Sequence, residues 1–574
     1  MQTVTLTIDG KKITVPYGTT ILEAAKEVGI DIPTLCYMKG INEIGACRVC
    51  VVEIDGYRNL EPSCIYKAAD GMVVKTNSKR AREARRVNAE LLLSDHAKDC
   101  LVCARNNDCE LQELAAKLHI DDYRFEGAKN IGEIDDSSPS ILRDMSKCIN
   151  CRKCIAVCAK VQGVHALGAA DRGFETVVVP AQHYDLGEIS CVACGQCVVA
   201  CPTGALTEVS HINKVIRALN DDKKHVVIQT APAIRVSIGE EFDIEPGTNV
   251  QGKLVSALRQ IGFDGVFDTD FTADLTIIEE GYELINRVKN SGVLPMITSC
   301  SPGWIKFIEH NYPELLDHLS TCKSPQQMFG TLAKTYYAEK EGIDPKDIFS
   351  VSLMPCTAKK YESQRPEMND SGHQDVDAVL TTREAAKLIK SSGIDLKFME
   401  DEDYDAPLGI STGAGVIFGA TGGVMEAALR TAYEVLTGEE LAKLDFEELR
   451  GTTGIKYASV PVGDLTINVA VTHSLVKARE LMDKLKAGEL SDIHFIEVMA
   501  CPGGCINGGG QPRSKDPDIV NKRIKGLYDV DKAMTLRKSH ENPAVNKLYE
   551  EFLGEPNGHK SHELLHTHYT KREL

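Results

Sequence analysis

Hydrophobic and polar positions alternate near the start of the chain. Over residues 4–15 every second position is apolar on either side of Asp9-Gly10. A period of two around an Asp-Gly pair predicts a β-hairpin. Over Thr20–Val28 the apolar positions recur with helical spacing, so a helix is expected to follow the hairpin.

The pattern changes further along the chain. Residues 79–93 are charged and helical in pattern, and from about residue 211 short apolar runs alternate with amphipathic segments. This alternation is typical of an α/β domain. The segments that we expect there are strands at Val226–Thr230 and Ile348–Met354, a helix at Leu254–Gly262 and a charged helical tail over 521–574.

Composition limits the possible classes. With 574 residues the chain is too long for one core, and a net charge of −18 makes nucleic acid an improbable partner. No apolar run is long enough for a membrane span, and the N-terminus resembles a strand rather than a secretion signal. We therefore expect a multidomain cytoplasmic protein that binds neither membranes nor nucleic acid.

Cysteine is the residue type that carries most information. Fifteen of the 20 cysteines precede residue 202, many at C-x-x-C spacing, which in a chain without a secretion signal indicates metal or redox chemistry. The first group suits a [2Fe–2S] cluster, with a four-cysteine zinc site as the alternative. Its members are Cys36, Cys47, Cys50 and Cys64.

The second group adds a histidine to three cysteines. Such a set can hold zinc or a [4Fe–4S] cluster, and its redox neighbours favour the cluster. Its members are His96, Cys100, Cys103 and Cys109.

Two consecutive C-x2-C-x2-C-x3-C runs give the strongest local signal. This is the pattern of two-cluster ferredoxins, in which the fourth cysteine of each run binds the other cluster. One [4Fe–4S] cluster is then assigned to Cys148, Cys151, Cys154 and Cys201. The other is assigned to Cys191, Cys194, Cys197 and Cys158.

Three loops in the C-terminal half contain further cysteines framed by Gly, Pro and Met. They are Thr298–Trp304 (TSCSPGW), Met354–Glu362 (MPCTAKKYE) and Glu497–Pro512 (EVMACPGGCINGGGQP). Cys356, Cys501 and Cys505 could share one metal centre, with glycines allowing close backbone approach. A buried Lys359 beside it would need an anionic partner, either Glu362 or a ligand of the metal.

These loops resemble the three signature motifs of [FeFe] hydrogenases, TSCCPxW, MPCxxKxxE and ExMxCxxGCxxGGGxP. The resemblance covers nearly the whole chain and implies a multidomain α+β protein. The first two modules also resemble the large iron–sulfur subunit of respiratory complex I. The implied domains are a [2Fe–2S] β-grasp ferredoxin-like domain (1–78), a small His/Cys [4Fe–4S] domain (79–118), a two-[4Fe–4S] ferredoxin domain (119–210), an α/β H-cluster domain (211–520) and a small-subunit-like tail (521–574).

The resemblance implies five cofactors: one [2Fe–2S], three [4Fe–4S] and an H-cluster, which is a [4Fe–4S] cubane joined to a di-iron unit with CO, cyanide and a dithiolate bridge. Cys505 would bridge its halves, Cys501 and Cys356 would bind the cubane, and Lys359 would hydrogen-bond a cyanide. The other implied contacts are Ala231, Pro232, Ala233 (a serine in many members), Gln326, Met354 and Met499. For the two methionines an ordinary core role is equally consistent.

One position departs from the family. Members usually have two adjacent cysteines in the first loop, and this chain has Cys300-Ser301. Either Cys300 is the proton donor and Ser301 takes the position of the fourth cubane ligand, or a shifted loop makes Cys300 the ligand. Thiolate is the better ligand for such a cluster.

The family's proton relay maps onto five residues. They are Cys300, Glu280, Ser320, Glu283 and Arg287. On a helix, Glu280, Glu283 and Arg287 would share a face, which from spacing alone favours a solvated charged surface. Cys322 fits no motif and is expected to be a buried structural cysteine.

The leading functional interpretation is reversible conversion of H2 into protons and electrons, with ferredoxin as electron partner. The tail resembles that of hydrogen-activating subunits of NAD(P)-linked hydrogenases, so a flavin-containing NAD(P)H-binding subunit and a small [2Fe–2S] subunit are further expected partners. An H2 sensor with little turnover is the alternative from another functional class.

Overall fold

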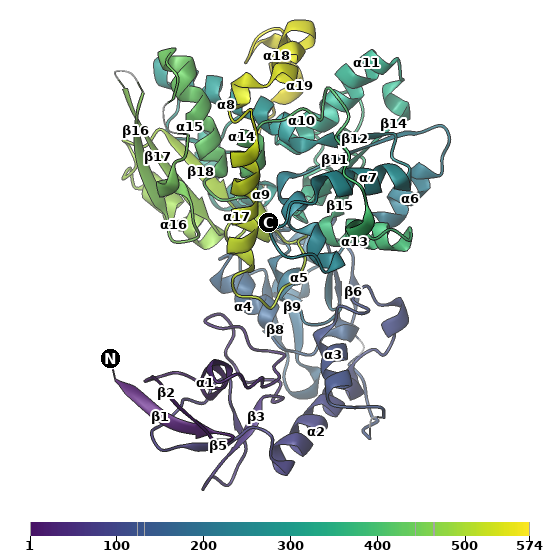
Figure 1. Ribbon diagram of the computed structural model, residues 1–574, viewed down its shortest axis with the longest axis vertical. Coiled ribbons are helices and arrows are strands. Elements are labelled where there is room, and N and C mark those ends of the chain that lie inside the picture. The colour runs from purple at the N-terminus through teal and green to yellow at the C-terminus, as the bar shows by residue number, and fades with distance from the viewer. Residues whose placement is uncertain (1, 123, 131, 442–443, 463–464, 573–574) are drawn as a thin grey trace. The chain divides into compact units, whose positions relative to one another are not determined.

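The computed structural model describes the whole chain except residues 1, 123, 131, 442–443, 463–464 and 573–574 (Figure 1). The chain forms two compact units. The N-terminal unit comprises residues 1–160, 165–189 and 200–207, and the C-terminal unit comprises 161–164, 190–199 and 208–574.

The N-terminal unit begins with the predicted hairpin. Asp9 and Gly10 adopt positive φ angles of 47° and 83°, which suits a tight hairpin turn. Thr20 caps the predicted helix by accepting a hydrogen bond from the backbone N–H of Glu23. The five-stranded sheet has the order β2-β1-β5-β3-β4. Its elements are β1 (Thr3–Ile8), β2 (Lys11–Pro16), α1 (Ile21–Glu27), β3 (Val51–Ile54), β4 (Glu61–Pro62) and β5 (Val73–Lys75).

Short helices and strands complete this unit. The predicted charged helix is α2 (Lys79–Asp95). The other elements are α3 (Glu110–Lys117), β6 (Ile134–Asp135), β7 (Ile141–Asp144), α4 (Lys153–Lys160), β8 (Leu167–Ala170), β9 (Val177–Pro180) and β10 (Leu206–Glu208).

A parallel four-stranded sheet forms one half of the C-terminal unit, in the order β12-β11-β14-β15. Both predicted strands belong to it. Alternate residues of β11 point into different cores, since Val226 and Ile228 pack with one cluster and Val227 with another. The strands are β11 (His225–Thr230), β12 (Gly265–Asp268), β14 (Ile348–Met354) and β15 (Ala378–Thr381). The helices α6 (Ile212–Leu219), α7 (Gln251–Ile261) and α13 (Thr382–Ser391) pack with them.

A second sheet, in the order β13-β18-β17-β16, forms the other half. Helix α8 (Thr269–Lys289) is buried along most of its length and contacts both α10 and α15. The strands are β13 (Met296–Ile297), β16 (Lys456–Val462), β17 (Leu465–His473) and β18 (Phe495–Met499). The remaining helices of the C-terminal unit that precede the tail are α5 (Gln196–Ala200), α9 (Pro302–Asn311), α10 (Pro325–Leu332), α11 (Ala338–Glu341), α12 (Ala358–Glu362), α14 (Gly413–Val416), α15 (Gly423–Thr437) and α16 (Leu475–Lys486).

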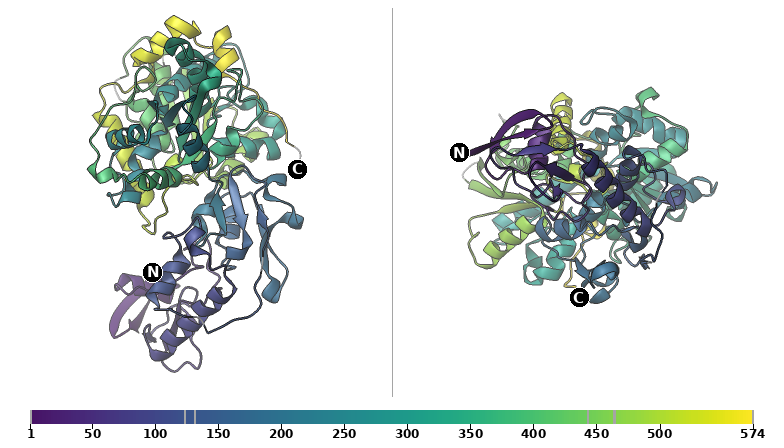
Figure 2. Two further views of the ribbon diagram at one scale, coloured as in Figure 1. Left: turned by 90° about the vertical axis from the view of Figure 1, so that its right-hand side faces the viewer. Right: turned by 90° about the horizontal axis from the view of Figure 1, so that it is seen from below.

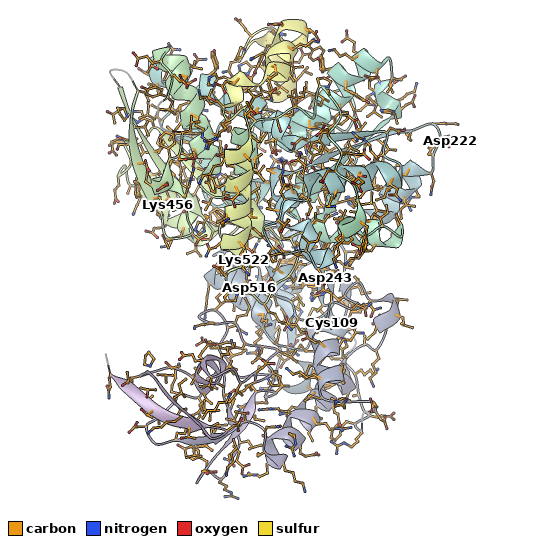
Figure 3. The ribbon with its side chains drawn as sticks, viewed as in Figure 1. Cys109, Asp222, Asp243, Lys456, Asp516 and Lys522 are labelled. Atoms are coloured by element: carbon orange, nitrogen blue, oxygen red, sulfur yellow. The ribbon has the colours of Figure 1, made fainter. Side chains whose placement is uncertain are left out.

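The tail is helical, as predicted, and covers the outside of this unit (Figure 2). It contains α17 (Ile519–Ala533), α18 (Pro543–Leu548) and α19 (His559–Leu565). Helix α17 packs on α14, α18 on α8 and α19 on α10. Near the start of α17, Lys522 Nζ lies 2.8 Å from Asp516 Oδ2 (Figure 3). Among the helices that the structure describes, none combines the length and apolarity that a membrane crossing requires.

Candidate functional site

The three C-terminal loops meet around one cavity. The loops after β14 and β18 and the first turn of α9 form its walls, together with the residues after β11. Nearly all of the predicted H-cluster contacts line it. These are Ala231, Pro232, Ala233, Cys300, Ser301, Gln326, Met354, Cys356, Lys359, Met499, Cys501 and Cys505.

Three of the cysteines that line this cavity come from the second and third loops, and they form no disulfide. Burial raises the pKa values of Cys356, Cys501 and Cys505, that of Cys505 to about 12. The neighbouring backbone leaves no room for larger residues: a Cβ at Gly508 would lie 2.1 Å from the Pro355 carbonyl oxygen. Buried, protonated thiols are poor hydrogen-bonding groups, whereas bound iron would hold them as thiolates.

The residues present fit an H-cluster. Several cysteines line the cavity and offer the soft sulfur donors that iron–sulfur ligation requires. In addition, the buried Gln326 Oε1 has no hydrogen-bond partner among the described residues, so the cavity contains an unsatisfied polar atom. The lining of the cavity is thus chemically suited to such a group.

Lys359 is fixed on the cavity wall by Glu362. Its Nζ lies 3.1 and 2.9 Å from the two carboxylate oxygens of Glu362 and donates to the Cys300 carbonyl oxygen at 3.2 Å. Glu362 is therefore an anionic partner of the buried lysine, which the sequence had left open. The pair places a lysine and its carboxylate partner together beside the cavity.

Met354 and Met499 serve in the core and at the cavity together. Each lines the cavity, and each also belongs to a large hydrophobic cluster of the unit. The two sequence interpretations are therefore compatible, because these flexible side chains fill the boundary between core and site.

Cys300 and Ser301 have different surroundings within the cavity. Burial raises the pKa of Cys300 most, and the Glu280 carboxylate raises it further. Cys505 also raises this pKa, whereas Lys359 lowers it. Ser301 Oγ instead accepts a hydrogen bond from the backbone N–H of Ala500, at 3.4 Å, next to Cys501. The loop thus presents its two side chains to different parts of the cavity.

The predicted relay residues on α8 are not solvated. Glu280 is 1% exposed, and burial raises its pKa to about 8. Ser320 Oγ donates to Glu283 Oε2 at 2.9 Å, and Arg287 donates to Glu283 Oε1 at 2.7 Å. Glu280 is thus fully enclosed and Glu283 and Arg287 are half-buried, so this face of α8 is not the open charged surface that the spacing alone suggests.

The loop that carries Cys194 packs tightly against the same cavity. Thr357 Oγ1 donates to the Ala193 carbonyl oxygen at 2.7 Å, and Gln196 Nε2 donates to the Asn507 carbonyl oxygen at 2.9 Å. A Cβ at Gly195 would lie 2.3 Å from Thr357 Oγ1. Cys194 itself lines the cavity, so a cluster bound by this loop would adjoin the H-cluster ligands.

In the N-terminal unit, the four cysteines assigned to one ferredoxin cluster line a single cavity. They are Cys148, Cys151, Cys154 and Cys201. Cys201, the fourth cysteine of this cavity, belongs to the second run, which is compatible with the crossed ligand pattern that the sequence predicts. Cys158 lies on α4 of this unit, whereas Cys191 and Cys197 belong to the C-terminal unit.

The four N-terminal cysteines are buried. Cys50 Sγ is 3.3 Å from Cys64 Sγ. A hydrogen bond with Cys36 lowers the pKa of Cys47 to about 6 and raises that of Cys36. Such close thiol pairs are consistent with one small cluster.

His96 offers a nitrogen for a metal. It is buried, its Nδ1 has no hydrogen-bond partner among the described residues, and burial lowers its pKa. A neutral imidazole with a free nitrogen is the metal-binding form of histidine. Cys100 is exposed, and Cys103 and Cys109 are half-buried.

Glu497 was not predicted as a site residue from the sequence, although it begins the third loop and fixes it to a neighbouring segment. Its carboxylate accepts hydrogen bonds from the backbone N–H groups of Gly422 and Met425, at 2.6 and 2.8 Å, and burial raises its pKa to about 7. Its place as the first residue of the third motif was the available signal.

Five family matches cover most of the chain. Residues 224–509 match the iron-only hydrogenase large subunit, C-terminal domain, and residues 517–572 match the iron hydrogenase small subunit. The N-terminal matches are a 2Fe-2S iron-sulfur cluster binding domain (1–79), the NADH-ubiquinone oxidoreductase-G iron-sulfur binding region (85–124) and a 4Fe-4S dicluster domain (147–205).

Individual relatives agree with these matches. The chain is 54% identical to the NADP-reducing hydrogenase subunit HndD of Solidesulfovibrio fructosivorans, over 100% of both chains. It is 42% identical to iron hydrogenase 1 of Clostridium pasteurianum, over 99% of this chain and 100% of that one. A solved structure of a variant of [FeFe]-hydrogenase HydA1 from Chlamydomonas reinhardtii matches with 44% identity and a TM-score of 0.58, covering 64% of this chain and 100% of that one. Together with the cavity and its cysteines, these similarities show that the chain belongs to the [FeFe] hydrogenases, in a form with accessory iron–sulfur domains.

Proposed function

We propose that this iron hydrogenase is the hydrogen-activating subunit of an NAD(P)-linked complex, with ferredoxin as a further electron partner. The observation that carries the hydrogenase activity is the single cavity shared by the three cysteine loops. The full-length similarity to an NADP-reducing hydrogenase subunit supports the NAD(P) link. A flavin-containing NAD(P)H-binding subunit and a small [2Fe–2S] subunit would complete the complex.

An H-cluster bound in the cavity would supply the two-electron chemistry of hydrogen. We assign Cys356, Cys501 and Cys505 as its thiolate ligands, and Lys359 as donor to an anionic ligand of the di-iron unit. Ala231, Pro232, Met354 and Met499 would exclude water, and the amide of Gln326 would face the small ligands.

The hydrogen bond from Ser320 Oγ to Glu283 supports the outer part of the proton path that we propose. Cys300 would exchange a proton with the reacting centre, Glu280 would carry it, and Ser320 would connect Glu280 to Glu283. The elevated pKa of Glu280, about 8, keeps a transferable proton there near neutral pH.

Ser301 then takes the position of the fourth cubane ligand, as its contact beside Cys501 supports. Its oxygen, or a water molecule on that iron, would replace the usual thiolate and alter the cubane potential.

Electrons would pass along one [2Fe–2S] and three [4Fe–4S] clusters. The His96 group would hold one [4Fe–4S], and the two ferredoxin runs would hold the others. A cytoplasmic location fits free thiols and a nicotinamide partner.

Infrared spectroscopy of anaerobically matured protein tests the proposal. Sharp CO and cyanide bands that shift under H2, with rapid H2 turnover, are expected. NADP⁺ reduction should require the flavin-containing partner. Fully iron-loaded protein without those bands would contradict the H-cluster, and bands with negligible turnover would indicate an H2 sensor instead.

A further inference from the structure

Three buried side chains meet at the outer end of the proposed relay, and two of them are not part of it. Glu283, Cys322 and His566 each offer a polar atom, and these atoms lie within 4.8 Å of one another. His566 directly follows α19, and a β-bridge between Cys322 and His566 holds this part of the tail in place. A titratable residue of the C-terminal tail thus reaches the relay.

Arg287 closes the other side of Glu283. Its guanidinium donates to Glu283 Oε1 at 2.7 Å and to the carbonyl oxygens of Leu319 and Asp317 at 2.7 and 3.0 Å. A guanidinium stays protonated and accepts no hydrogen bond. Arg287 can stabilise the charge of Glu283, but it cannot carry a proton onward by releasing one.

His566 has the chemistry that Arg287 lacks. An imidazole exchanges protons near neutral pH through either of its nitrogens. Its Nδ1 lies 2.8 Å from Thr321 Oγ1, and Cys322 Sγ lies 3.9 Å from Glu283 Oε2. When two ordinary hydrogen bonds meet at one tetrahedral atom, the two outer heavy atoms lie roughly 4.6 Å apart. One bridging hydroxyl, thiol or water therefore suffices between His566 and Glu283.

His562 extends this path to the surface. Its ring centroid is 4.2 Å from that of His566, and His562 is exposed whereas His566 is only 6% exposed. The other titratable groups around His566 are Glu279 from α8, which lies 3.1 Å from its Nε2, and Tyr549, whose hydroxyl donates to Glu279.

We propose that His562 and His566 form a proton entrance through the C-terminal tail that joins the relay at Glu283. The proposal rests on the hydrogenase function above. For H2 formation, water gives a proton to His562. An N–H bond of His562 then breaks as an N–H bond forms on His566. The bridging group next donates its own proton to Glu283 and receives the proton of His566 in its place. No electron moves, and H2 oxidation reverses each step. His566 touches neither substrate nor cofactor and acts through Glu283.

The test uses the matured holoenzyme and the variants H566Q, H562Q and H566A. H559Q is the matched control, because His559 lies on the same helix with a side chain 97% exposed. We measure H2 evolution from pH 6 to 9, the solvent deuterium isotope effect, the infrared spectrum and the thermal unfolding midpoint. The expected result is that H566Q evolves H2 about tenfold more slowly, with a larger isotope effect and unchanged infrared bands. Added imidazole should restore part of the rate of H566A.

Other outcomes separate the explanations. Rates within twofold of wild type for H566Q and H562Q at every pH would overturn the histidine entrance while leaving the hydrogenase intact. A slow H566A that imidazole does not rescue, with an unchanged isotope effect, would show a structural role only and would equally overturn it. The exposed H562Q keeps the test valid should H566Q not fold. If the wild-type protein itself lacks CO and cyanide bands, the proposed function fails instead.

Discussion

Lys359 Nζ lies 2.9 Å from Glu362 Oε2, one helical turn away on α12. The same carboxylate oxygen accepts hydrogen bonds from Ser324 Oγ and Gln326 Nε2, each at 2.9 Å. One buried carboxylate therefore orients both the lysine and the glutamine that line the cavity. Glu362 contributes to the site although it does not itself line the cavity.

The substitution Glu362→Gln tests this positioning. An amide cannot balance the buried ammonium, and removing one partner of a buried ion pair costs about 3–5 kcal/mol. We expect at least a roughly tenfold loss of H2 turnover and shifted CO and cyanide bands, because Lys359 and Gln326 lose their anchor. Glu341→Gln, on the exposed end of α11, is the control. Wild-type bands and rates in E362Q would contradict the assignment.

Cys300 and Ser301 can be distinguished by separate substitutions. If Cys300 is the proton donor, C300A should retain its iron and its infrared bands but evolve H2 about 100-fold more slowly. If Ser301 is at the ligand position, S301C should keep turnover and change the electron paramagnetic resonance signal of the cubane, since a thiolate replaces an oxygen or water. Iron loss in C300A, measured by iron content, would instead make Cys300 the ligand.

The sequence predicted the fold where structure is local. The hairpin at β1 and β2, the helix α2 and the strands β11 and β14 follow directly from apolar periodicity. The cysteine groups could also be recognised from the sequence, because cluster ligation requires short and regular spacings on one loop.

The environment of α8 could not be predicted from spacing. Glu280, Glu283 and Arg287 have the pattern of a solvated face, yet the helix is enclosed by segments far away in the sequence. His566 reaches this helix from a position 287 residues beyond Glu279. Such contacts depend on the packing of the tail, which no local pattern encodes.

Substitution of Cys201 tests the crossed ligand pattern of the ferredoxin runs. Cys201 lines the same cavity as Cys148, Cys151 and Cys154, so C201A should lose one cluster, or about four iron atoms per chain. Cys322 is also buried but belongs to none of the predicted cluster groups, so C322A is the matched control. We expect C322A to keep its full iron content. An unchanged iron content in C201A would place the fourth ligand elsewhere.

Asp274 links the tail to α8, and its titration should be visible in the stability of the protein. Its carboxylate accepts hydrogen bonds from Thr412, Ser539 and Asn542. Burial nevertheless raises its pKa to about 7, above the value of about 3.9 in an unfolded chain. Between these values the folded state holds a proton that the unfolded state has released. Its contribution to stability is therefore complete below about pH 4 and is lost as the pH rises through 7.

The variant D274N cannot titrate, so its free energy of unfolding should depend less on pH than that of the wild type. The wild type should lose up to about 1.4 kcal/mol per pH unit from this group between pH 5 and 7, or roughly 3–4 kcal/mol over the full range. D274N is less stable at pH 5, because an amide nitrogen cannot accept the hydrogen bonds, and its deficit should shrink towards pH 8. Thermal unfolding midpoints at each pH measure this, with D222N as the control, since Asp222 is exposed on the surface (Figure 3). A deficit that stays constant from pH 5 to 8 would mean that Asp274 is ionised in the folded protein throughout, held by its three hydrogen-bond donors against the cost of burial.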